Sequence, residues 1–345
     1  MRLGIGHNAD QFPVGIDWIA IENLAAQQGL AAVVLDGIEY LPDEARPPKE
    51  LMLQWIGNTL QSYEYRYEIY RQTIIELSTW YNSRGFKMMI LKGYACALNW
   101  PKPEHRPCGD IDIWLFGKQK DADELLKKEK GIKIDTSHHH HTVFNWRDFS
   151  VENHYDFINI YRNSPNKKQE LLLKELGKDD SHYVELNGVR VYLPSPNLHA
   201  FFILRHTMGH FVTSEITLRQ VLDWAFFVEK QGKDVDWDWL LRLLDEYGMR
   251  DFFSCLNGIC VEDLWFDADI FPYVQYNSDL KERVLNEIVT PEFQGREPKL
   301  LFPRLVFKYK RWKANGWKHK LCYKESMWRS FWSGIWNHLL KPASI

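Results

Sequence analysis

Hydrophobic and polar positions divide this chain into a helical first region, a β-rich middle and a helical last region. Between residues 16 and 83, apolar side chains such as Leu51, Trp55 and Trp80 recur with a roughly helical period. From 85 to 194 the apolar residues gather in short runs separated by Gly, Pro and Asn, a pattern typical of strands. The helical period returns from Asn197. We therefore expect three regions, 1–83, 84–195 and 196–345.

Short apolar runs in the middle region predict the strands of a small sheet. The expected strands cover 86–91, 110–115, 140–146, 149–158, 183–185 and 190–192. Asn187-Gly188 separates the last two runs and predicts a tight hairpin turn. A short helix is expected over 94–100, where Pro101 ends it, and a charged helix near 118–130.

Two helices in the outer regions have the same capping pattern. Asp17 stands twelve residues before Gly29, and Asp236 stands twelve residues before Gly248. Asp accepts hydrogen bonds from the first turn of a helix, and Gly readily ends one. We interpret the pair as two similarly capped helices, with a distant duplication as the alternative.

The composition is that of a globular protein with an uneven charge distribution. The 345 residues are 45% hydrophobic and 26% charged, with a net charge of -3. From Pro303 onward the sequence has ten basic residues and a single acidic one, Glu325. The net charge is therefore +9 for the tail and -12 for residues 1–302. Five tryptophans lie among these basic residues: Trp312, Trp317, Trp328, Trp332 and Trp336. The 303–345 tail is either a helix with its Trp side packed inward, an anionic-membrane contact, or a nucleic-acid contact.

Cysteine usage and hydropathy predict a cytoplasmic protein, with peripheral membrane association through the tail left open. The five cysteines show no CxxC pairing, which is typical of reduced thiols. The N-terminal residues have no apolar signal core, and no run approaches the ~18 apolar residues of a membrane span. The oligomeric state cannot be inferred from the sequence.

Two aspartates one residue apart, Asp110 and Asp112, are the strongest chemical signal. In a strand they project to the same side, while Ile111 and Ile113 face a core. Two adjacent carboxylates repel each other, and a divalent cation relieves that repulsion. Oxygen ligands favour Mg²⁺ or Mn²⁺ over zinc. The pair therefore indicates metal-assisted chemistry on a phosphorylated substrate.

A possible anion site precedes the aspartates. Lys92-Gly93 ends an apolar run and opens a helix, and Gly lets phosphate oxygens approach the backbone. Lys92 adds a mobile cation, and Arg106 lies between the turn and the aspartates, where it could reach a triphosphate. Most Lys-Gly pairs mark ordinary turns, so the position before the aspartates gives this one its value.

A third carboxylate is expected on a neighbouring strand. Phosphoryl transfer with two metal ions needs one more acidic ligand than the aspartate pair supplies. In the 149–158 run, Glu152, His154 and Asp156 share one face. The alternative is an edge strand with a solvated polar face.

Histidines form two further groups. In a strand, at most two of His138–His141 could face one ion, and one interpretation is that His140 or His141 contacts substrate or supports the carboxylates. The alternatives are a plain polar face and a zinc site. His206 and His210 are helical neighbours, which we interpret as hydrogen-bonded core residues rather than ligands.

The order of these motifs resembles a known family, the uncharacterised nucleotidyltransferases of bacterial polysaccharide loci, a branch of the DNA polymerase β-like superfamily. The resemblance rests on Leu91-Lys92-Gly93, on the run from Arg106 to Ile113 and on Val151-Glu152-Asn153-His154-Tyr155. It extends to the Asp17 and Asp236 helices and to 218–225, and so covers most of 16–260.

The resemblance implies an α+β fold, in which a small mixed β-sheet nucleotidyltransferase-like core (84–195) has helical N-terminal and C-terminal extensions. It also implies that Asp110 and Asp112 bind Mg²⁺, that Glu152 is the third carboxylate, and that Gly93 shapes the phosphate turn. This chain departs from the superfamily in having Tyr94 where a second small residue is usual, and Glu152 where Asp is more usual.

We therefore expect a Mg²⁺- or Mn²⁺-dependent nucleotidyltransferase that moves a nucleoside monophosphate from an NTP to a hydroxyl acceptor. Lys92, Gly93 and Arg106 would bind the nucleotide, with His154, Asp156 and His141 near the substrate or behind the metal ligands. The acceptor is open between a sugar, an antibiotic-like molecule, a protein side chain and tRNA. The alternatives are a catalytically degenerate binding or scaffold component of a surface-polysaccharide system, and a phosphohydrolase that uses the histidine strand.

Overall fold

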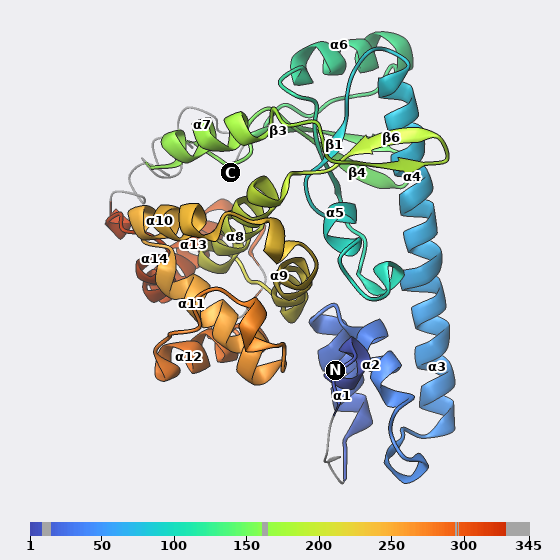
Figure 1. Cartoon of the computed structure of the whole chain (residues 1–345), viewed down its shortest axis with the longest axis vertical. Coiled ribbons are helices and arrows are strands. Elements are labelled where there is room, and N and C mark those ends of the chain that lie inside the picture. The colour runs from blue at the N-terminus through green and yellow to red at the C-terminus, as the bar shows by residue number, and fades with distance from the viewer. Residues whose placement is uncertain (9–14, 161–164, 294, 296, 329–345) are drawn as a thin grey trace.

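The computed structural model describes residues 1–8, 15–160, 165–293, 295 and 297–328. A six-stranded mixed sheet lies in the upper part of the molecule as drawn in Figure 1, beside α4 (Arg66–Asn82) and α6 (Gln119–Lys130). The strand order is β3-β4-β2-β1-β6-β5. The strands are β1 (Met89–Ile90), β2 (Ile111–Trp114), β3 (His141–Trp146), β4 (Phe149–His154), β5 (Tyr183–Leu186) and β6 (Val189–Tyr192). β2 runs parallel to β4, β1 runs parallel to β6, and the other neighbours are antiparallel. This mixed sheet among helices confirms the expected α+β class.

Along the chain, helices lie before, between and after the strands of the sheet. Those of the N-terminal part are α1 (Trp18–Gln27), α2 (Ala31–Ile38), α3 (Lys49–Thr59) and α4 (Arg66–Asn82). Those between the strands are α5 (Tyr94–Ala97), α6 (Gln119–Lys130) and α7 (Asn166–Leu176). Those of the C-terminal part are α8 (Pro196–Thr213), α9 (Leu218–Gln231), α10 (Trp237–Tyr247), α11 (Arg250–Gly258), α12 (Ser278–Val289), α13 (Leu301–Ala314) and α14 (Gly316–Cys322). A π-helical stretch (Leu60–Tyr65) joins α3 to α4, so the two form one long rod along a side of the molecule (Figure 1).

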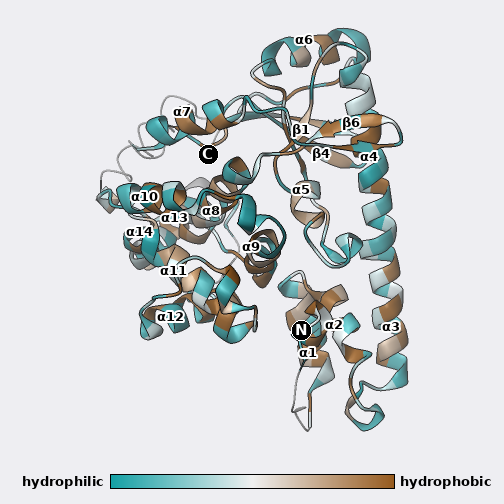
Figure 2. Cartoon of the chain, viewed as in Figure 1, coloured by the Kyte–Doolittle hydropathy of each residue, from teal (hydrophilic) through white to brown (hydrophobic). Residues whose placement is uncertain are grey.

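Strand alternation gives the sheet two different buried faces. On one face Ile111 and Ile113 of β2 pack with Val151 of β4 in a cluster that also contains residues of α4 and α6. On the other face Trp114 belongs to the larger cluster formed mainly by the C-terminal helices. The strands are accordingly rich in hydrophobic residues (Figure 2). Asp112 alternates with Ile111 and Ile113, and therefore lies on the face toward the C-terminal helices.

Both predicted helix caps are present. The side chain of Asp17 accepts a hydrogen bond from the backbone N–H of Ala20 at 3.0 Å, and that of Asp236 accepts one from Trp239 at 2.9 Å. Gly248 ends α10 in the left-handed conformation, with φ of 72°. The Asn187-Gly188 hairpin turn is also present, with positive φ at both residues, as this type of turn requires.

Three boundaries differ from the sequence expectations in ways that affect the site, the first being that β2 begins at Ile111 rather than at Asp110. β4 ends at His154 rather than at 158, because the backbone N–H groups of Tyr155 and Asp156 both turn to the carbonyl of His140. β3 begins at His141 rather than at 140, so His140 precedes the strand. Helix α7 was not expected; its buried residues, such as Leu173, pack beneath the loop that follows β4.

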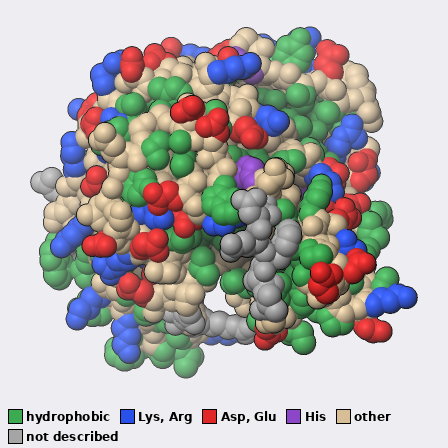
Figure 3. Space-filling model, turned by 60° about the horizontal axis from the view of Figure 1, so that its bottom comes forward, with side chains coloured by type: hydrophobic (Ala, Val, Ile, Leu, Met, Phe, Trp, Pro, Cys, Tyr) green, Lys and Arg blue, Asp and Glu red, His purple; other side chains and the backbone are tan. Residues whose placement is uncertain are grey.

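The tail is described only as far as residue 328, so Trp332 and Trp336 lie outside the described residues. Glu297 pairs with Arg304 and Lys308 of α13, while α14 is largely buried. Acidic and basic side chains are interspersed on the face shown in Figure 3. In the part of the chain that the structure describes, every helix is too short or too polar to cross a membrane.

Candidate active site

The register of two parallel strands places the key carboxylates side by side. Asp112 of β2 stands opposite Glu152 of β4, and Trp114 stands opposite His154. In β3, His141 stands opposite His154. Residues in register share a face of the sheet, so Asp112, Glu152, His154 and His141 all project toward the C-terminal helices. The sequence prediction that Glu152 lies next to the aspartate strand agrees with this geometry.

Asp112 is the buried centre of the group, with a side chain only 1% exposed. Its Oδ1 lies 3.2 Å from the Lys92 ammonium and 3.2 Å from Nε2 of His154. Its other oxygen, Oδ2, is buried and has no hydrogen-bond partner among the described residues. A buried carboxylate oxygen without a donor is energetically costly. Binding of a cation at Oδ2 of Asp112 would remove that cost.

Opposite charges hold the group together. Burial lowers the pKa of His154, but hydrogen bonds to Asp112 and Glu152 outweigh it and raise that pKa to about 9. Burial likewise lowers the pKa of Lys92, whereas Asp112, Asp110 and Glu152 raise it above its ordinary value. Burial raises the pKa of Glu152, yet His154, His141 and Lys92 bring it below the ordinary value. Near neutral pH an ionised Glu152 therefore lies beside two cations, Lys92 and His154.

Three side chains at this point can hold one ion. Asp112, Glu152 and His154 each offer a ligand atom, and these atoms lie within 4.8 Å of one another. Nδ1 of His154 donates to the backbone carbonyl of Asp156 at 3.1 Å, which leaves Nε2 facing the carboxylates. Metal-binding histidines are typically oriented by such a hydrogen bond. The set thus combines two carboxylates and one imidazole, whereas the sequence indicated oxygen ligands alone.

Asp110 lies one residue before β2 and is not part of this three-residue group. It is partly exposed, and its charge raises the pKa of Lys92. Its backbone carbonyl accepts a hydrogen bond from the Tyr70 hydroxyl at 2.9 Å. Asp110 is therefore more exposed than Asp112 and lies outside the three-residue group.

Gly93 forms the turn that was expected to shape a phosphate site. Its φ of 60° and ψ of -100° suit only glycine. A Cβ at this position would lie 2.5 Å from the Tyr70 hydroxyl. Gly93 thus lets the turn pack against the Tyr70–Asp110 hydrogen bond. The helix that follows, α5, has only four residues, so its dipole adds little attraction for an anion.

Arg106, expected on the triphosphate, has a different partner. Its Nε and Nη2 donate to the two carboxylate oxygens of Asp223 in α9, at 2.7 and 2.9 Å. Trp100 Nε1 also donates to Asp223, at 2.9 Å. Because Arg106 and Asp223 are 7% and 5% exposed, this ion pair joins the Pro-rich loop to the C-terminal helices. The geometry gives Arg106 a structural role as the partner of Asp223.

Asp156 and His141 occupy different positions. Asp156 was expected to share a face with Glu152 and His154, but it lies beyond the end of β4, where it pairs with Lys174 of α7 and orients His154 through its backbone. His141 does face the site, with Nδ1 3.6 Å from Oε2 of Glu152. Burial lowers the pKa of His141 to about 4. It is therefore a neutral imidazole beside the carboxylates.

Two side chains beside the site, His206 and Arg219, were not predicted from the sequence to have a role in it. Nε2 of His206 in α8 lies 2.8 Å from the Lys92 ammonium, and burial lowers the pKa of His206 well below its ordinary value. His206 was expected to be a core residue; its hydrogen bond instead orients Lys92. Arg219 lies in the first turn of α9, and its buried Nε has no hydrogen-bond partner among the described residues. Burial lowers the pKa of its guanidinium, and the charges of Asp223 and Asp110 partly oppose this decrease. The only sequence signal for Arg219 was its place in the 218–225 segment.

Comparison with known proteins assigns the family. A family model described as an uncharacterised nucleotidyltransferase matches residues 15–265. The chain belongs to this uncharacterised nucleotidyltransferase family. The match includes the Lys92-Gly93 turn, the aspartate strand and Glu152, so this family membership agrees with the resemblance drawn from those motifs.

Two further comparisons add little to the family assignment. Among solved structures, the chain is similar to an antigenic nucleotidyltransferase-like protein from Paracoccidioides brasiliensis, at 16% identity over 46% of this chain and 75% of that one, with a TM-score of 0.32. No curated protein matches the chain. Membership in the nucleotidyltransferase family therefore rests on the sequence match.

Proposed function

We propose that this protein is a metal-dependent nucleotidyltransferase that transfers a nucleoside monophosphate from an NTP to a hydroxyl acceptor. The observation that supports this proposal most directly is the parallel register of β2 and β4. It brings Glu152 beside Asp112, although the two residues are far apart in the sequence. Membership in a nucleotidyltransferase family and a pair of carboxylates on adjacent strands of this chain both favour phosphoryl chemistry.

The residues present fit a divalent cation. Asp112 has a buried oxygen without a donor, and Glu152 and His154 lie close enough to complete a three-ligand set. Asp110, which is partly exposed, is the remaining carboxylate of the expected set. An ion held there would draw electron density from the phosphoryl oxygens and lower the pKa of an attacking hydroxyl. Because one ligand is an imidazole, Mn²⁺ suits the set at least as well as Mg²⁺.

The protein groups have separate roles in the proposed transfer. The acceptor oxygen forms a bond to the α-phosphorus, and the bond from that phosphorus to the β-phosphate bridging oxygen breaks. Pyrophosphate leaves with the bonding electron pair. The hydroxyl proton passes to Glu152, which the lowered pKa keeps ionised near neutral pH, and from there to water. Lys92 supplies a fixed positive charge for the phosphates, with His206 holding its ammonium in position.

A mass measurement tests the reaction type. The protein is incubated with pooled NTPs and Mg²⁺ or Mn²⁺, alone and with candidate acceptors, and all components are weighed by mass spectrometry. We expect a gain equal to one nucleoside monophosphate on an acceptor or on the protein itself. In parallel, thermal shift with each NTP should show stabilisation that depends on the metal, because a ligand that binds the native state raises the melting temperature.

Matched variants make this test specific. Asp112→Asn should abolish both transfer and the metal-dependent shift. Asp148→Asn, an exposed acid in the turn between β3 and β4, makes the same chemical change away from the site and should leave both intact. If no NTP stabilises the wild-type protein with either metal and no acceptor gains mass, the catalytic proposal fails. A non-catalytic binding or scaffold role would then be favoured.

A further inference from the structure

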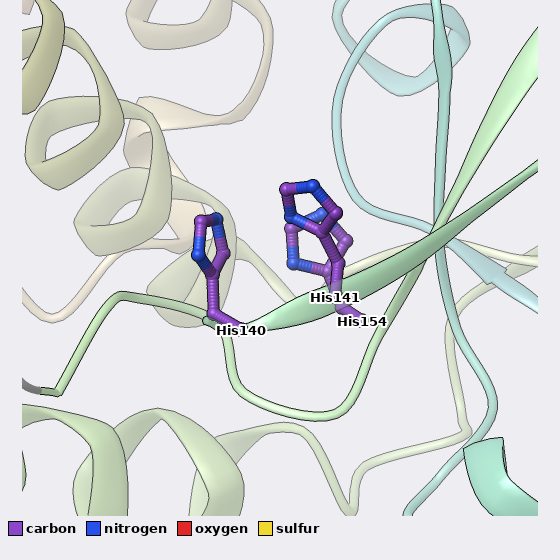
Figure 4. Close-up of side chains that lie close together, drawn as sticks. All are labelled: His140, His141 and His154. Carbon is purple, nitrogen blue, oxygen red and sulfur yellow. The ribbon is translucent and has the colours of Figure 1, made fainter. Parts of the chain in front are cut away.

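A second group of possible ligands lies beside the carboxylates. His140, His141 and His154 each offer a ring nitrogen, and these nitrogens lie within 4.8 Å of one another (Figure 4). Their ring centroids are 4.3 to 5.5 Å apart. His140 comes from the loop before β3, His141 from the start of β3 and His154 from the end of β4.

Backbone hydrogen bonds fix the two segments that bear these histidines. The carbonyl of His140 accepts from the N–H groups of both Tyr155 and Asp156, each at 3.0 Å. His141 is registered opposite His154. The strand alternation expected from the sequence would have separated His140 from His141. Because β3 begins one residue later than expected, His140 turns toward the other two rings instead.

Several ring nitrogens in the cluster have no hydrogen-bond partner among the described residues. These are Nδ1 of His140 and both nitrogens of His141, a side chain that is only 5% exposed overall. Leaving a buried polar atom unsatisfied is unfavourable, and such atoms in native proteins usually have a ligand or a water. The third member is oriented, because Nδ1 of His154 donates to the carbonyl of Asp156 and so presents Nε2 to the cluster.

We propose that His140, His141 and His154 form a binding site for a nitrogen-preferring transition-metal ion, with Zn²⁺ as the preferred occupant. Three imidazoles with an open fourth position are a known zinc ligand set. Zn–N bonds of about 2.0–2.1 Å require the nitrogens to move together by roughly an ångström, which side-chain rotation supplies. Two carboxylates lie beside this group: Glu152, 3.6 Å from Nδ1 of His141, and Asp112, 3.2 Å from Nε2 of His154.

His154 couples this site to the carboxylate group. Its Nε2 lies 3.2 Å from Asp112 in the present arrangement, and the same nitrogen, once its proton has been released to solvent, would bind the ion held by the other two histidines. Occupation of the histidine site therefore withdraws His154 from Asp112. The site goes beyond the proposed nucleotidyl transfer, since zinc binding needs neither an NTP nor an acceptor.

The test uses the full-length protein purified without a histidine tag and treated with a chelator. Zinc binding is measured by isothermal titration calorimetry, and Co²⁺ is added as a spectroscopic substitute whose visible absorption reports imidazole ligands. We expect one zinc per chain. His140→Ala and His141→Ala should each weaken zinc binding by roughly 100-fold or more, because losing a ligand costs more than losing an outer-shell partner. The visible Co²⁺ bands should disappear in both variants.

Two controls separate this outcome from others. His182→Gln alters an exposed histidine before β5 and should bind zinc as the wild type does. Asp112→Asn keeps all three histidines, so it should still bind one zinc per chain without the loss expected of the histidine variants, while losing nucleotidyl transfer; failure of one proposal therefore does not decide the other. Circular dichroism confirms that each variant folds, and His141→Gln replaces His141→Ala if the latter does not. Wild-type zinc affinity in both histidine variants, or equal loss in Asp112→Asn, would overturn the proposed site.

Discussion

The buried ion pair between Arg106 and Asp223 gives the sharpest test of how this chain is assembled. Asp223→Asn keeps the shape and the acceptor oxygen for Trp100, but leaves the Arg106 guanidinium buried without a counter-charge. Removing one partner of such a pair typically costs about 3–5 kcal/mol. With an unfolding entropy of about 2.1 cal/mol/K per residue over 345 residues, that loss lowers the melting temperature by about 4–7 °C.

Urea and thermal unfolding followed by circular dichroism measure the effect. Arg106→Met in the Asp223→Asn background removes the stranded charge, so the double variant should be more stable than Asp223→Asn alone. The matched control is Asp245→Asn, which removes the counter-charge of Arg250 in a similar two-point pair. Because Asp245 is 60% exposed, that change should cost less than about 1 kcal/mol.

Nucleotide affinity then separates a structural Arg106 from a phosphate-binding one. If Arg106 acts only through Asp223, Arg106→Met and Asp223→Asn should change NTP affinity by similar factors. An unchanged melting temperature for Asp223→Asn would contradict the buried-pair argument. A loss of NTP affinity confined to Arg106→Met would show that Arg106 reaches the phosphates, as the sequence indicated.

Three further predictions concern the surroundings of the site and the core. Gly93→Ala forces a Cβ toward the Tyr70 hydroxyl at a positive φ, so urea unfolding should show a loss of roughly 1–3 kcal/mol, partly recovered when Tyr70→Phe removes that hydroxyl. Burial raises the pKa of Glu170 from 4.5 to about 7, so its contribution to stability is complete below pH ~4.5 and is lost as the pH rises through about 7. The difference in unfolding free energy between the wild type and Glu170→Gln, measured in urea between pH 4.5 and 8, isolates this contribution and should fall by about 3 kcal/mol; a difference that stays constant over that range would refute the assignment. Trp224→Phe leaves the buried Oδ1 of Asn257 without its donor at 2.8 Å, and should lower the free energy of unfolding by about 1–3 kcal/mol in the same assay.

Local patterns were sufficient to predict much of the architecture. Helix caps at Asp17 and Asp236, the Asn187-Gly188 turn and the alternation around Asp112 depend on short-range geometry, and the structure contains all of them. Neighbouring residues determine such features, since hydrogen bonds within a turn and side-chain direction in a strand need no distant contact. Helix α7 was not expected, because its apolar residues find their partners only in the folded core.

Long-range contacts decided which candidate residues meet. The sequence identified Asp112 and Glu152 as possible partners, but only the parallel pairing of β2 with β4 sets them side by side. The same sequence could not show that Asp223, more than a hundred positions away, holds Arg106 in the core. Ion pairs, strand register and the exact start of a strand depend on how distant segments pack, and one residue of difference at the start of β3 turned His140 toward His141 and His154.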